Sequence, residues 1–464
     1  MLINPKIFVI ASMVVLAPLR VSAETGDYSS WQAFFNLFFP PGADNPVTNA
    51  EATAADYPLL DNPAGFNDGF SRGDYYKWQT VQLHPTTGAM CSNGSPYKFF
   101  INRVPTTRNT VFYFEGGGAC WDYPGCTGAD GVRSARNRDG IPDDYVGAGS
   151  PETDLVSPFI FRLHPYTRAK TQDWNLVYVP YCTGDVYSGD ELGVYTDEGG
   201  SGETIMFRHN GVKNVRAAVA WMKNNMPRPG QLLMTGCSAG GAGSFTNYHP
   251  TRRDMDATKN FLINDSGPIF PTDRNGPVSA NPSQRLHEQI ISAWGLSEVF
   301  DYLQNELVMF NQHNLGTLNT ALALNYLNDR LGHVGYQRDE NYSSYSYERF
   351  FDEISNEPDP EKRRDLILEK WAVDTQKFAD LLNTLPNYGG YFPYFRDLNE
   401  SHCATIVDFE NGDIQERNLE LADFVDSVLD GGGPVLDAKE ADTVSDEAKP
   451  FNAVYALVNL LLGF

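Results

Sequence analysis

The stretch Gly236-Cys-Ser-Ala-Gly240 is the most informative part of this 464-residue chain. It matches the pattern Gly-x-Ser-x-Gly, in which a sharp turn between a strand and a helix exposes a nucleophilic serine. Residues 231–235 are predicted to form a short buried strand, and residues 241–246 can begin a helix. Glycine is needed on both sides because a Cβ atom would clash in so tight a turn. The pattern alone also fits a glycine-rich turn that happens to contain serine, so the other residues decide its meaning.

Apolar, β-branched and aromatic runs alternate with amphipathic stretches along the chain, and this alternation favours an α/β fold over an all-β fold. Apolar residues at positions 212, 215, 219 and 222 recur at helical spacing, so we predict that residues 211–226 form a crossover helix. Long polar stretches at 125–150 and 187–202 are predicted to be loops that cover one edge of the sheet. The predicted strands are residues 98–102, 110–114, 175–180, 231–235, 260–263 and 331–336.

The N-terminal residues are typical of an export signal. Residues 1–6 carry one positive side chain, residues 7–19 are apolar, and Val21-Ser22-Ala23 is a small-residue cleavage site. The apolar run is too short to span a bilayer comfortably, which argues against a membrane anchor. We therefore predict a signal peptide over residues 1–23.

The rest of the chain, residues 24–464, has the composition of one large globular domain. The motifs that carry chemistry lie between about residues 91 and 407, and we expect this part to be the catalytic core. The acidic segment 408–450 contains a run of three glycines and is predicted to be peripheral or partly disordered. The apolar run 453–462 is predicted to be a helix that docks on the core.

The charge of the chain limits its partners. The chain has 35 Lys and Arg residues against 59 Asp and Glu residues, which gives a formal net charge of −24 at pH 7. So large a negative charge argues against nucleic-acid binding and against attraction to anionic membranes. No stable membrane insertion is expected. The six cysteines of a chain expected to be exported are predicted to form disulfides.

A serine that transfers acyl groups needs a base, an acid that orients the base, and donors for the oxyanion. In α/β-hydrolases the three residues follow along the chain in the order serine, acid, histidine. Among the histidines after Ser238, His402 lies on a late loop. His249 is too close behind the serine, and His333 lies inside a predicted strand. Three acids between the serine and the late histidine remain candidates: Asp339, Asp265 and Asp301.

The stretch Phe112-Tyr-Phe-Glu-Gly-Gly-Gly-Ala-Cys120 is a predicted strand that ends in a run of glycines. Bare glycine amides can approach a developing negative charge without obstruction by side chains, so this loop is a candidate for oxyanion binding. The alternatives are a flexible loop and a phosphate-binding loop. No Gly-Lys-Ser or Gly-Lys-Thr follows the glycines, which argues against phosphate binding.

Four stretches occur in a fixed order along the chain: Phe114-Glu-Gly-Gly-Gly-Ala-Cys120, Pro180-Tyr-Cys-Thr-Gly-Asp-Val-Tyr-Ser-Gly189, Gly236-Cys-Ser-Ala-Gly-Gly241 and Ser401-His-Cys403. Together they resemble the pectin acetylesterase family, which includes the animal carboxylesterase Notum. The resemblance runs from about Cys91 to about Cys403. It implies an α/β-hydrolase-like fold with a mostly parallel central sheet, flanking helices and long loop insertions. It also implies a Ser-Asp-His triad and no metal.

The resemblance carries specific residues over by position. The triad it implies is Ser238, Asp339 and His402, and the oxyanion donors it implies are the amides of Gly117, Gly118 and Ala239. Asp339 is favoured over Asp265 because residues 335–339 resemble the late strand of the family, in which an aromatic residue shortly precedes the acid. Ala119 stands where plant members carry tryptophan, which predicts an acyl pocket that is wider or shaped by other residues.

The resemblance further implies two disulfides, Cys91–Cys182 and Cys120–Cys126. Cys237 and Cys403 remain, and each adjoins a member of the implied triad. A disulfide between them would connect the serine turn to the His402 loop and stabilise the fold by about 2–4 kcal/mol. The alternatives are a nucleophilic Cys237 and a metal held by Cys403 and His402. No second His/Cys pair has the spacing of a zinc site, so neither a metal nor a cofactor is expected.

These inferences predict a secreted serine carboxylesterase, extracellular or periplasmic, that acts as a monomer on an ester substrate. The expected substrate is an O-acetylated polysaccharide, as the family name implies. One alternative is removal of fatty acyl groups from protein or lipid, as in Notum. Another is a non-catalytic carbohydrate-binding protein on a hydrolase fold, against which the intact serine, histidine and glycine loop argue. The negative charge would repel polygalacturonate unless salt or a local basic patch screens it.

Overall fold

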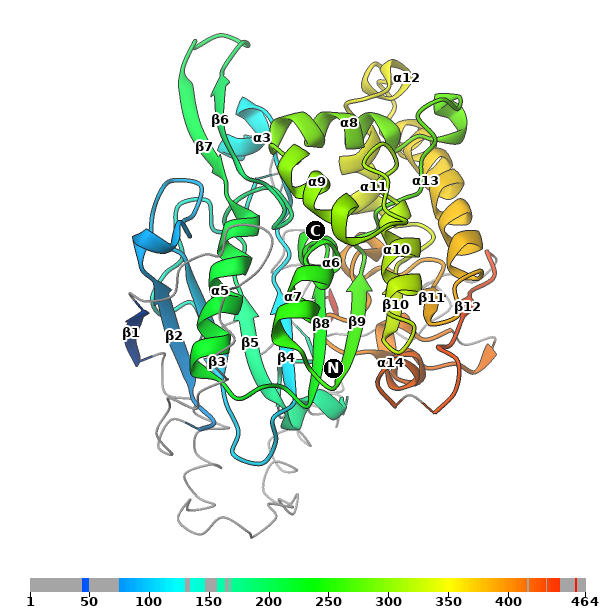
Figure 1. Cartoon of the computed structure of the whole chain (residues 1–464). Coiled ribbons are helices and arrows are strands. Elements are labelled where there is room, and N and C mark those ends of the chain that lie inside the picture. Colours follow the sequence, from blue (N-terminus) through cyan, green and yellow to red (C-terminus); the bar gives the residue numbers. More distant parts are fainter. Residues whose placement is uncertain are drawn as a thin grey trace, which may run out of the picture.

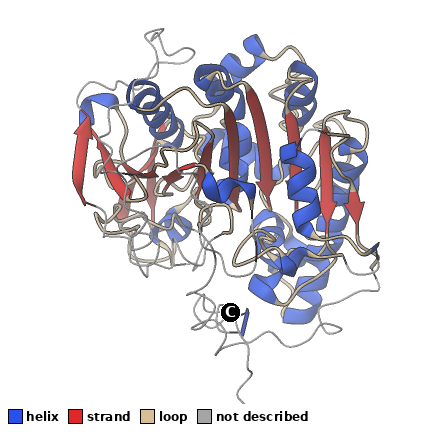
Figure 2. Ribbon diagram, turned by 90° about the horizontal axis from the view of Figure 1, so that it is seen from below, coloured by secondary structure: helices blue, strands red, loops and turns tan. Residues whose placement is uncertain are grey.

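The computed structural model describes residues 44–49, 75–129, 134–146, 157–162, 167, 169–414, 417–430, 432–442 and 455–456. In this part of the chain, helices surround a central sheet of ten strands, and a separate two-stranded hairpin projects from one end (Figure 1, Figure 2). The predicted signal peptide at 1–23 lies outside the described residues. So does the apolar run 453–462, except for residues 455 and 456. None of the described helices has a stretch that is long and apolar enough to span a bilayer.

The central sheet determines where a site can lie. Its strands are β1 (Asp44–Asn49), β2 (Trp78–Leu83), β3 (Lys98–Asn102), β4 (Thr110–Phe114), β5 (Asn175–Val179), β8 (Gln231–Cys237), β9 (Lys259–Asp265), β10 (Arg330–Val334), β11 (Tyr388–Phe392) and β12 (Ala438–Lys439). They are ordered β1-β2-β3-β5-β4-β8-β9-β10-β11-β12, and β3 alone is antiparallel to its neighbours. The carboxyl ends of the parallel strands therefore meet along one edge, which is where α/β proteins bind their ligands.

Helices cover this sheet in the connections between its strands. They are α3 (Tyr123–Thr127), α5 (Gly211–Asn225), α6 (Ala239–Thr246), α7 (Tyr248–Met255), α8 (Gln284–Ala293), α9 (Ser297–Glu306), α10 (Thr317–Asn325), α11 (Glu340–Tyr347), α12 (Asp352–Ser355), α13 (Pro360–Leu382) and α14 (Leu421–Asp430). The predicted crossover helix is α5, and the four apolar residues that predicted it are all buried. The mostly parallel sheet with helices around it confirms the predicted α/β-hydrolase-like class.

The predicted strands are all present. Two have the predicted bounds, and the other four differ by one or two residues at their ends. Sequence reasoning missed β1, β2 and β12, and also β11, in which Gly389 and Gly390 interrupt the apolar pattern. Neither position has room for a side chain, because a Cβ atom at Gly389 would overlap the Leu436 carbonyl oxygen and one at Gly390 would overlap the Phe392 ring. Glycine weakens the strand signal but permits this close approach.

The predicted loop 187–202 is a correction, because it contains the first strand and most of the turn of a β-hairpin. The strands β6 (Glu191–Thr196) and β7 (Thr204–His209) pair in antiparallel fashion, with Val194 opposite Met206. One face of the hairpin packs on the core through Phe207, and the other exposes Leu192, Val194 and Met206. Only one face is covered, and polar residues are interspersed along both strands, so the sequence has a loop-like composition.

The acidic segment 408–450 is more integral than predicted. Within its described residues, α14 packs against β9 and β10, and Phe424 and Val428 fill the space over Gly332. The strand β12 extends the sheet beyond β11. The apolar stripe of α14 and the pairing of β12 therefore make this part of the segment a component of the fold, and the expectation of a peripheral tail does not hold there.

A buried ion pair connects the end of this segment to the body of the domain. Arg396 and Glu440 are both fully buried, and two guanidinium nitrogens donate to the two carboxylate oxygens at 2.8 Å each. The same carboxylate also accepts the Tyr394 amide at 2.5 Å. A bidentate pair with additional hydrogen bonds meets the geometric conditions under which burial of two charges is tolerated.

We expect the Glu440→Gln substitution to lower the free energy of unfolding by about 3–5 kcal/mol, because it leaves a buried guanidinium without its counter-charge. Urea unfolding followed by tryptophan fluorescence measures this loss. The double change Arg396→Met with Glu440→Leu should cost less than the single one, since no charge remains unpaired. As a control, Glu353→Gln in the solvent-exposed pair with Lys370 should change stability by less than about 1 kcal/mol. Equal midpoints for Glu440→Gln and wild type would contradict the importance of the pair.

Candidate active site

Ser238 lies on the strand–turn–helix that its sequence motif predicts. It follows β8, precedes the first residue of α6, and has a φ of 59° and a ψ of −125°. A Cβ atom at Gly236 or Gly240 would overlap the Phe114 carbonyl oxygen, so glycine is required where this turn packs against β4. The Ser238 amide donates to the Asp265 carbonyl oxygen at 2.9 Å. The serine is half-buried, so its hydroxyl is held at a strained turn that solvent can reach.

His402 and Asp339 are in direct contact, as the resemblance implies. Asp339 follows β10 and caps α11, where one of its oxygens accepts the Tyr342 amide at 2.8 Å. Its other oxygen lies 2.7 Å from Nδ1 of His402. Because an ionised carboxylate only accepts hydrogen bonds, Nδ1 carries the proton, and Nε2 of the neutral ring is then the basic nitrogen.

The two rival acids occupy other positions. Asp265 is fully buried at the end of β9, and its side chain accepts the amides of Ala404 and Thr405 at 3.0 and 2.7 Å. It therefore holds the backbone that follows His402 and does not contact the imidazole. Asp301 lies on α9 and is exposed to solvent. Of the three candidates, the structure brings only Asp339 to the histidine.

A disulfide joins the serine turn to the histidine loop. Cys237 and Cys403 are bonded, with their Cα atoms 5.6 Å apart across 166 residues of sequence. The Cys403 amide also donates to the Ser266 hydroxyl at 3.0 Å. The other two expected disulfides, Cys91–Cys182 and Cys120–Cys126, are present as well. Closing so long a loop restricts the unfolded chain, and here it also keeps the two parts of the site together.

The loop that carries His402 has an unusual backbone. Asn399, Glu400, Ser401 and Cys403 all have positive φ values, between 52° and 67°. Non-glycine residues rarely adopt this region, and each costs free energy that neighbouring contacts must offset. The disulfide and the acceptors at the end of β9 supply these contacts. Strained backbone held by several independent contacts is characteristic of functional loops.

The glycine loop after β4 lies against the serine turn. A Cβ atom at Gly116 would lie 2.8 Å from the Cys237 carbonyl oxygen and 3.3 Å from Cβ of Ser238. Gly117 and Gly118 have φ values of 146° and 81°, which favour glycine. Their amides, like that of Ala239, donate to no acceptor within the described residues. Unused amides beside the serine can therefore donate to a bound oxyanion.

The electrostatic surroundings of His402 favour its protonated form. Burial of the ring lowers its pKa, but the charge of Asp339 and its hydrogen bond outweigh this effect. The negative charges of Asp265 and Glu400 add to it, so the pKa of His402 lies above its ordinary value. By contrast, burial lowers the pKa of both His249 and His287 to about 4. Those two histidines are therefore neutral packing residues at neutral pH.

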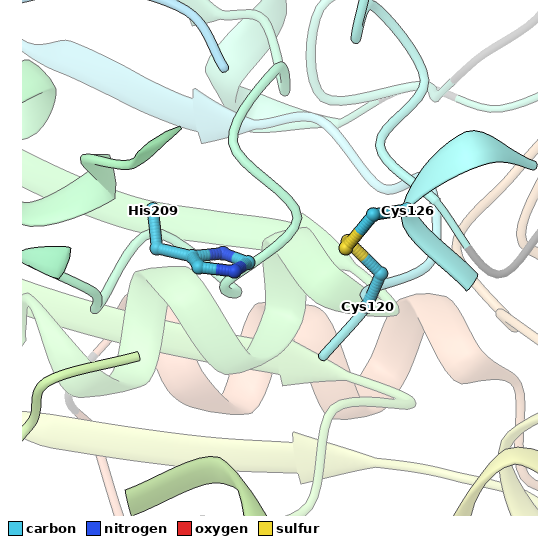
Figure 3. A group of neighbouring side chains, drawn as sticks. All are labelled: Cys120, Cys126 and His209. Atoms are coloured by element: carbon cyan, nitrogen blue, oxygen red, sulfur yellow. A yellow bond between two sulfur atoms is a disulfide. The ribbon is translucent and has the colours of Figure 1, made fainter. Parts of the chain in front are cut away.

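Among the residues that the structure describes, two groups of cysteine and histidine side chains have the proximity that metal sites require. One is Cys120, Cys126 and His209 (Figure 3), and the other is Cys237, His402 and Cys403. In both groups the sulfurs are bonded to each other and offer no thiolate to a metal. The nitrogens of His209 also have partners, the Thr183 carbonyl oxygen at 3.0 Å and the Tyr195 hydroxyl at 2.7 Å.

Comparison with known proteins gives one family and one fold. The family model for pectinacetylesterase matches residues 71–320, more than half of the chain, and includes Ser238 but not Asp339 or His402. The chain is 28% identical over 184 residues to palmitoleoyl-protein carboxylesterase NOTUM of Drosophila melanogaster, over 39% of this chain and 24% of that one. It is 24% identical to the human protein of the same name, over 38% of this chain and 33% of that one. The matches therefore span only about a quarter to a third of these relatives.

Two further likenesses concern activity and shape. A zebrafish protein (Danio rerio) named inactive palmitoleoyl-protein carboxylesterase notum1b is 26% identical over 24% of this chain and 72% of its own length. The crystal structure of the Wnt deacylase Notum from Drosophila superposes with a TM-score of 0.52 at 17% identity. That superposition covers 79% of this chain and 97% of that one. At this level of identity it establishes the shared fold.

We predict that His402 titrates with a pKa above the ordinary histidine value of about 6.5. The Asp339→Asn substitution leaves the His402 ring buried but removes the negative charge beside it. The pKa of His402 should therefore fall below that of the wild type. Changing the exposed Asp301 to Asn should leave it unchanged. NMR titration of the histidine Cε1 protons, assigned with His402→Gln, measures all three values.

The sign of the linked stability follows from the same pKa. Because folding raises the pKa of His402, its contribution to stability is complete below the unfolded value, near pH 6.5, and is lost as pH rises through the folded value. A His402 titration that is identical in wild type and Asp339→Asn would contradict the coupling.

Proposed function

Because this chain belongs to the pectinacetylesterase family, we propose that it is a secreted serine carboxylesterase. The observation that carries the proposal is the convergence of three segments at one sheet edge. The serine turn and the His402 loop are joined by a disulfide, and Asp339 contacts the imidazole at 2.7 Å. A nucleophile, a base and an acid that orients the base are the residues that acyl transfer requires.

The first half of the reaction acylates the serine. Nε2 of His402 accepts the Ser238 hydroxyl proton while Oγ bonds to the ester carbonyl carbon. The carbonyl electrons move to oxygen, and the amides of Gly117, Gly118 and Ala239 stabilise that oxyanion by about 3 kcal/mol each. When the tetrahedral intermediate collapses, the bond to the leaving alcohol breaks, and the alcohol takes the proton from the imidazolium.

The second half returns the enzyme to its starting state. Water enters in place of the alcohol and gives its proton to Nε2 of His402 as it attacks the acyl-enzyme. Collapse of the second intermediate releases the carboxylic acid and restores the Ser238 hydroxyl. Asp339 stays ionised throughout, keeps the imidazole in one tautomer and stabilises its positive charge in both steps.

An acetyl group is the acyl group that the name of the family suggests, and aromatic side chains are available near the histidine to contact a substrate. The Tyr342 ring lies 6.2 Å from the His402 ring, and Trp121 packs against Tyr345 and Phe350. We therefore propose an O-acetyl ester, carried on a polysaccharide as the family name suggests.

A second candidate is hydrolysis of a longer acyl chain. It is favoured by the relatives named palmitoleoyl-protein carboxylesterases, although the matches cover a minority of their length. One relative is named inactive. Binding without turnover is therefore a third outcome that the experiment has to distinguish.

The proposed location is outside the cytoplasm. Three disulfides in the described residues support an oxidising compartment, because thiols of cytosolic proteins are usually kept reduced. The predicted leader at 1–23 is consistent with this. The proposal implies that the exported protein begins near Glu24, which N-terminal sequencing of secreted material tests directly.

Hydrolysis of p-nitrophenyl esters from acetate to palmitate is the test of activity and chain length. The wild type should hydrolyse acetate with the highest kcat/KM, and Ser238→Ala should lower kcat by about 10⁶-fold. As a matched control, Ser244→Ala removes a hydroxyl that donates to the Gly241 carbonyl oxygen within the same helix. This variant should keep its activity within a few-fold of the wild type.

Each outcome points to one conclusion. A maximum at long chains that disappears in Ser238→Ala would replace the acetyl proposal by the fatty-acyl one. Activity that persists in Ser238→Ala would overturn the assignment of the nucleophile. A folded wild type without activity on any ester would favour binding without turnover.

A further inference from the structure

Glu115 is a buried carboxylate at the base of the glycine loop. It follows the last residue of β4, directly precedes Gly116, and is only 4% exposed. The proposed reaction gives it no part. Sequence reasoning also gave it none, although it lies inside the motif that pointed to the oxyanion loop. A charged residue buried at this position requires an explanation, because removing a carboxylate from water is costly.

The Glu115 carboxylate is surrounded by hydrogen-bond donors. One oxygen accepts the hydroxyls of Tyr178, at 2.8 Å, and of Tyr145. The other accepts the Tyr181 amide at 2.8 Å and the side-chain amide of Asn137 at 3.0 Å. These donors come from β5, from the chain that follows it, and from residues 137–145. The carboxylate thus connects the glycine loop to two separate segments.

The backbone of Glu115 is held in the same way. Its amide donates to the Val179 carbonyl oxygen at 3.1 Å, and its carbonyl oxygen accepts the Tyr187 hydroxyl at 2.8 Å. Arg136 lies 3.5 Å from the carboxylate through Nε, and its Cβ is only 2.6 Å from where a Cβ atom of Gly117 would be. The residue that pairs with Glu115 therefore also packs against the loop.

We infer that Glu115 is a positioning residue that holds the glycine loop in the geometry required to bind the oxyanion. The inference rests on the proposed function for its catalytic consequence. Oxyanion donors act only when they lie within hydrogen-bond distance of the developing charge before the reaction begins. A run of three glycines has little stiffness of its own. A carboxylate with hydrogen-bond donors on both oxygens gives the loop a fixed base.

A purely structural role accounts less well for the carboxylate. Apolar side chains in place of the carboxylate and its side-chain donors would fill the same space without the cost of burying a charge, so stability alone does not favour a carboxylate. The carboxylate adds a fixed orientation of the loop, because its two oxygens accept hydrogen bonds from four donors on neighbouring segments. An oxyanion loop requires amides that are held in a fixed orientation toward the reacting oxygen.

The test compares Glu115→Gln with a matched variant elsewhere. Asp374 on α13 is also fully buried, and accepts the Ser283 amide at 2.9 Å and the Tyr347 hydroxyl at 2.8 Å. Asp374→Asn is therefore a control for the loss of a buried charge away from the site. A third variant, Tyr178→Phe, removes one donor to Glu115 while keeping the ring, and provides a milder change if Glu115→Gln does not fold.

Kinetics with p-nitrophenyl acetate should separate positioning from stability. In Glu115→Gln we expect kcat to fall about tenfold with KM changed less than twofold, because the displaced amides stabilise the transition state and not the bound ester. Tyr178→Phe should show a smaller fall of the same kind. Asp374→Asn should lose thermal stability and keep its kcat. A Glu115→Gln variant with wild-type kcat, or an equal loss of kcat in Asp374→Asn, would overturn the inference.

Hydrogen exchange supplies a readout that does not depend on activity. The amides of Glu115 and Cys120 donate to backbone carbonyl oxygens on either side of the glycines, the latter to Gly184 at 2.9 Å. The peptide spanning residues 114–120 should exchange faster in Glu115→Gln than in the wild type and unchanged in Asp374→Asn. An inactive wild type with this exchange pattern would refute the esterase and leave the anchor standing. Unchanged exchange in Glu115→Gln would refute the anchor, whatever the activity.

Discussion

The short connection between the serine turn and the histidine loop is the constraint on which the rest of the site depends. Asp265 makes this connection from both ends, because its carbonyl oxygen accepts the Ser238 amide while its carboxylate accepts the amides of Ala404 and Thr405. The Cys237–Cys403 disulfide closes the same distance covalently. With these contacts in place, the positive-φ backbone of the histidine loop can be maintained, and the imidazole is presented to the acid at the end of β10.

Buried carboxylates around the site differ in what they hold. Asp339 binds an imidazole, Asp265 binds two backbone amides, and Glu115 binds the donors beneath the glycine loop. Burial raises the pKa of both Asp265 and Glu115, and hydrogen bonds from their neighbours act in the opposite direction. The imidazole, the histidine loop and the glycine loop of the proposed site are thus each held by one buried carboxylate, and of the three carboxylates Asp339 is the one that contacts the imidazole. Fixed charges and dipoles of this kind reduce the reorganisation that a reaction requires.

Features of the fold and the site that depend on local sequence could be predicted, and features that depend on contacts between distant residues could not. The serine turn was predictable because glycine spacing and the flanking strand and helix are local. The residue pattern by itself left Asp339 and Asp265 open, since both follow predicted strands, and only the family resemblance favoured Asp339. Tertiary contacts are what separate an acceptor of imidazole from an acceptor of backbone amides. The hairpin β6–β7 and the helix α14 were missed because each lies in a segment rich in acidic or polar residues, and their packing depends on distant partners.

Covalent labelling tests the central claim, that Ser238 is a nucleophile activated by the His402–Asp339 pair, most directly. Wild type, His402→Ala and Ser244→Ala would be treated with a fluorophosphonate and digested, and the modified residue located by mass spectrometry. The account predicts one adduct on Ser238 in the wild type and in Ser244→Ala, and a rate of labelling that falls by orders of magnitude in His402→Ala. An adduct on another residue, no adduct in folded wild type, or equal labelling without the histidine would contradict it.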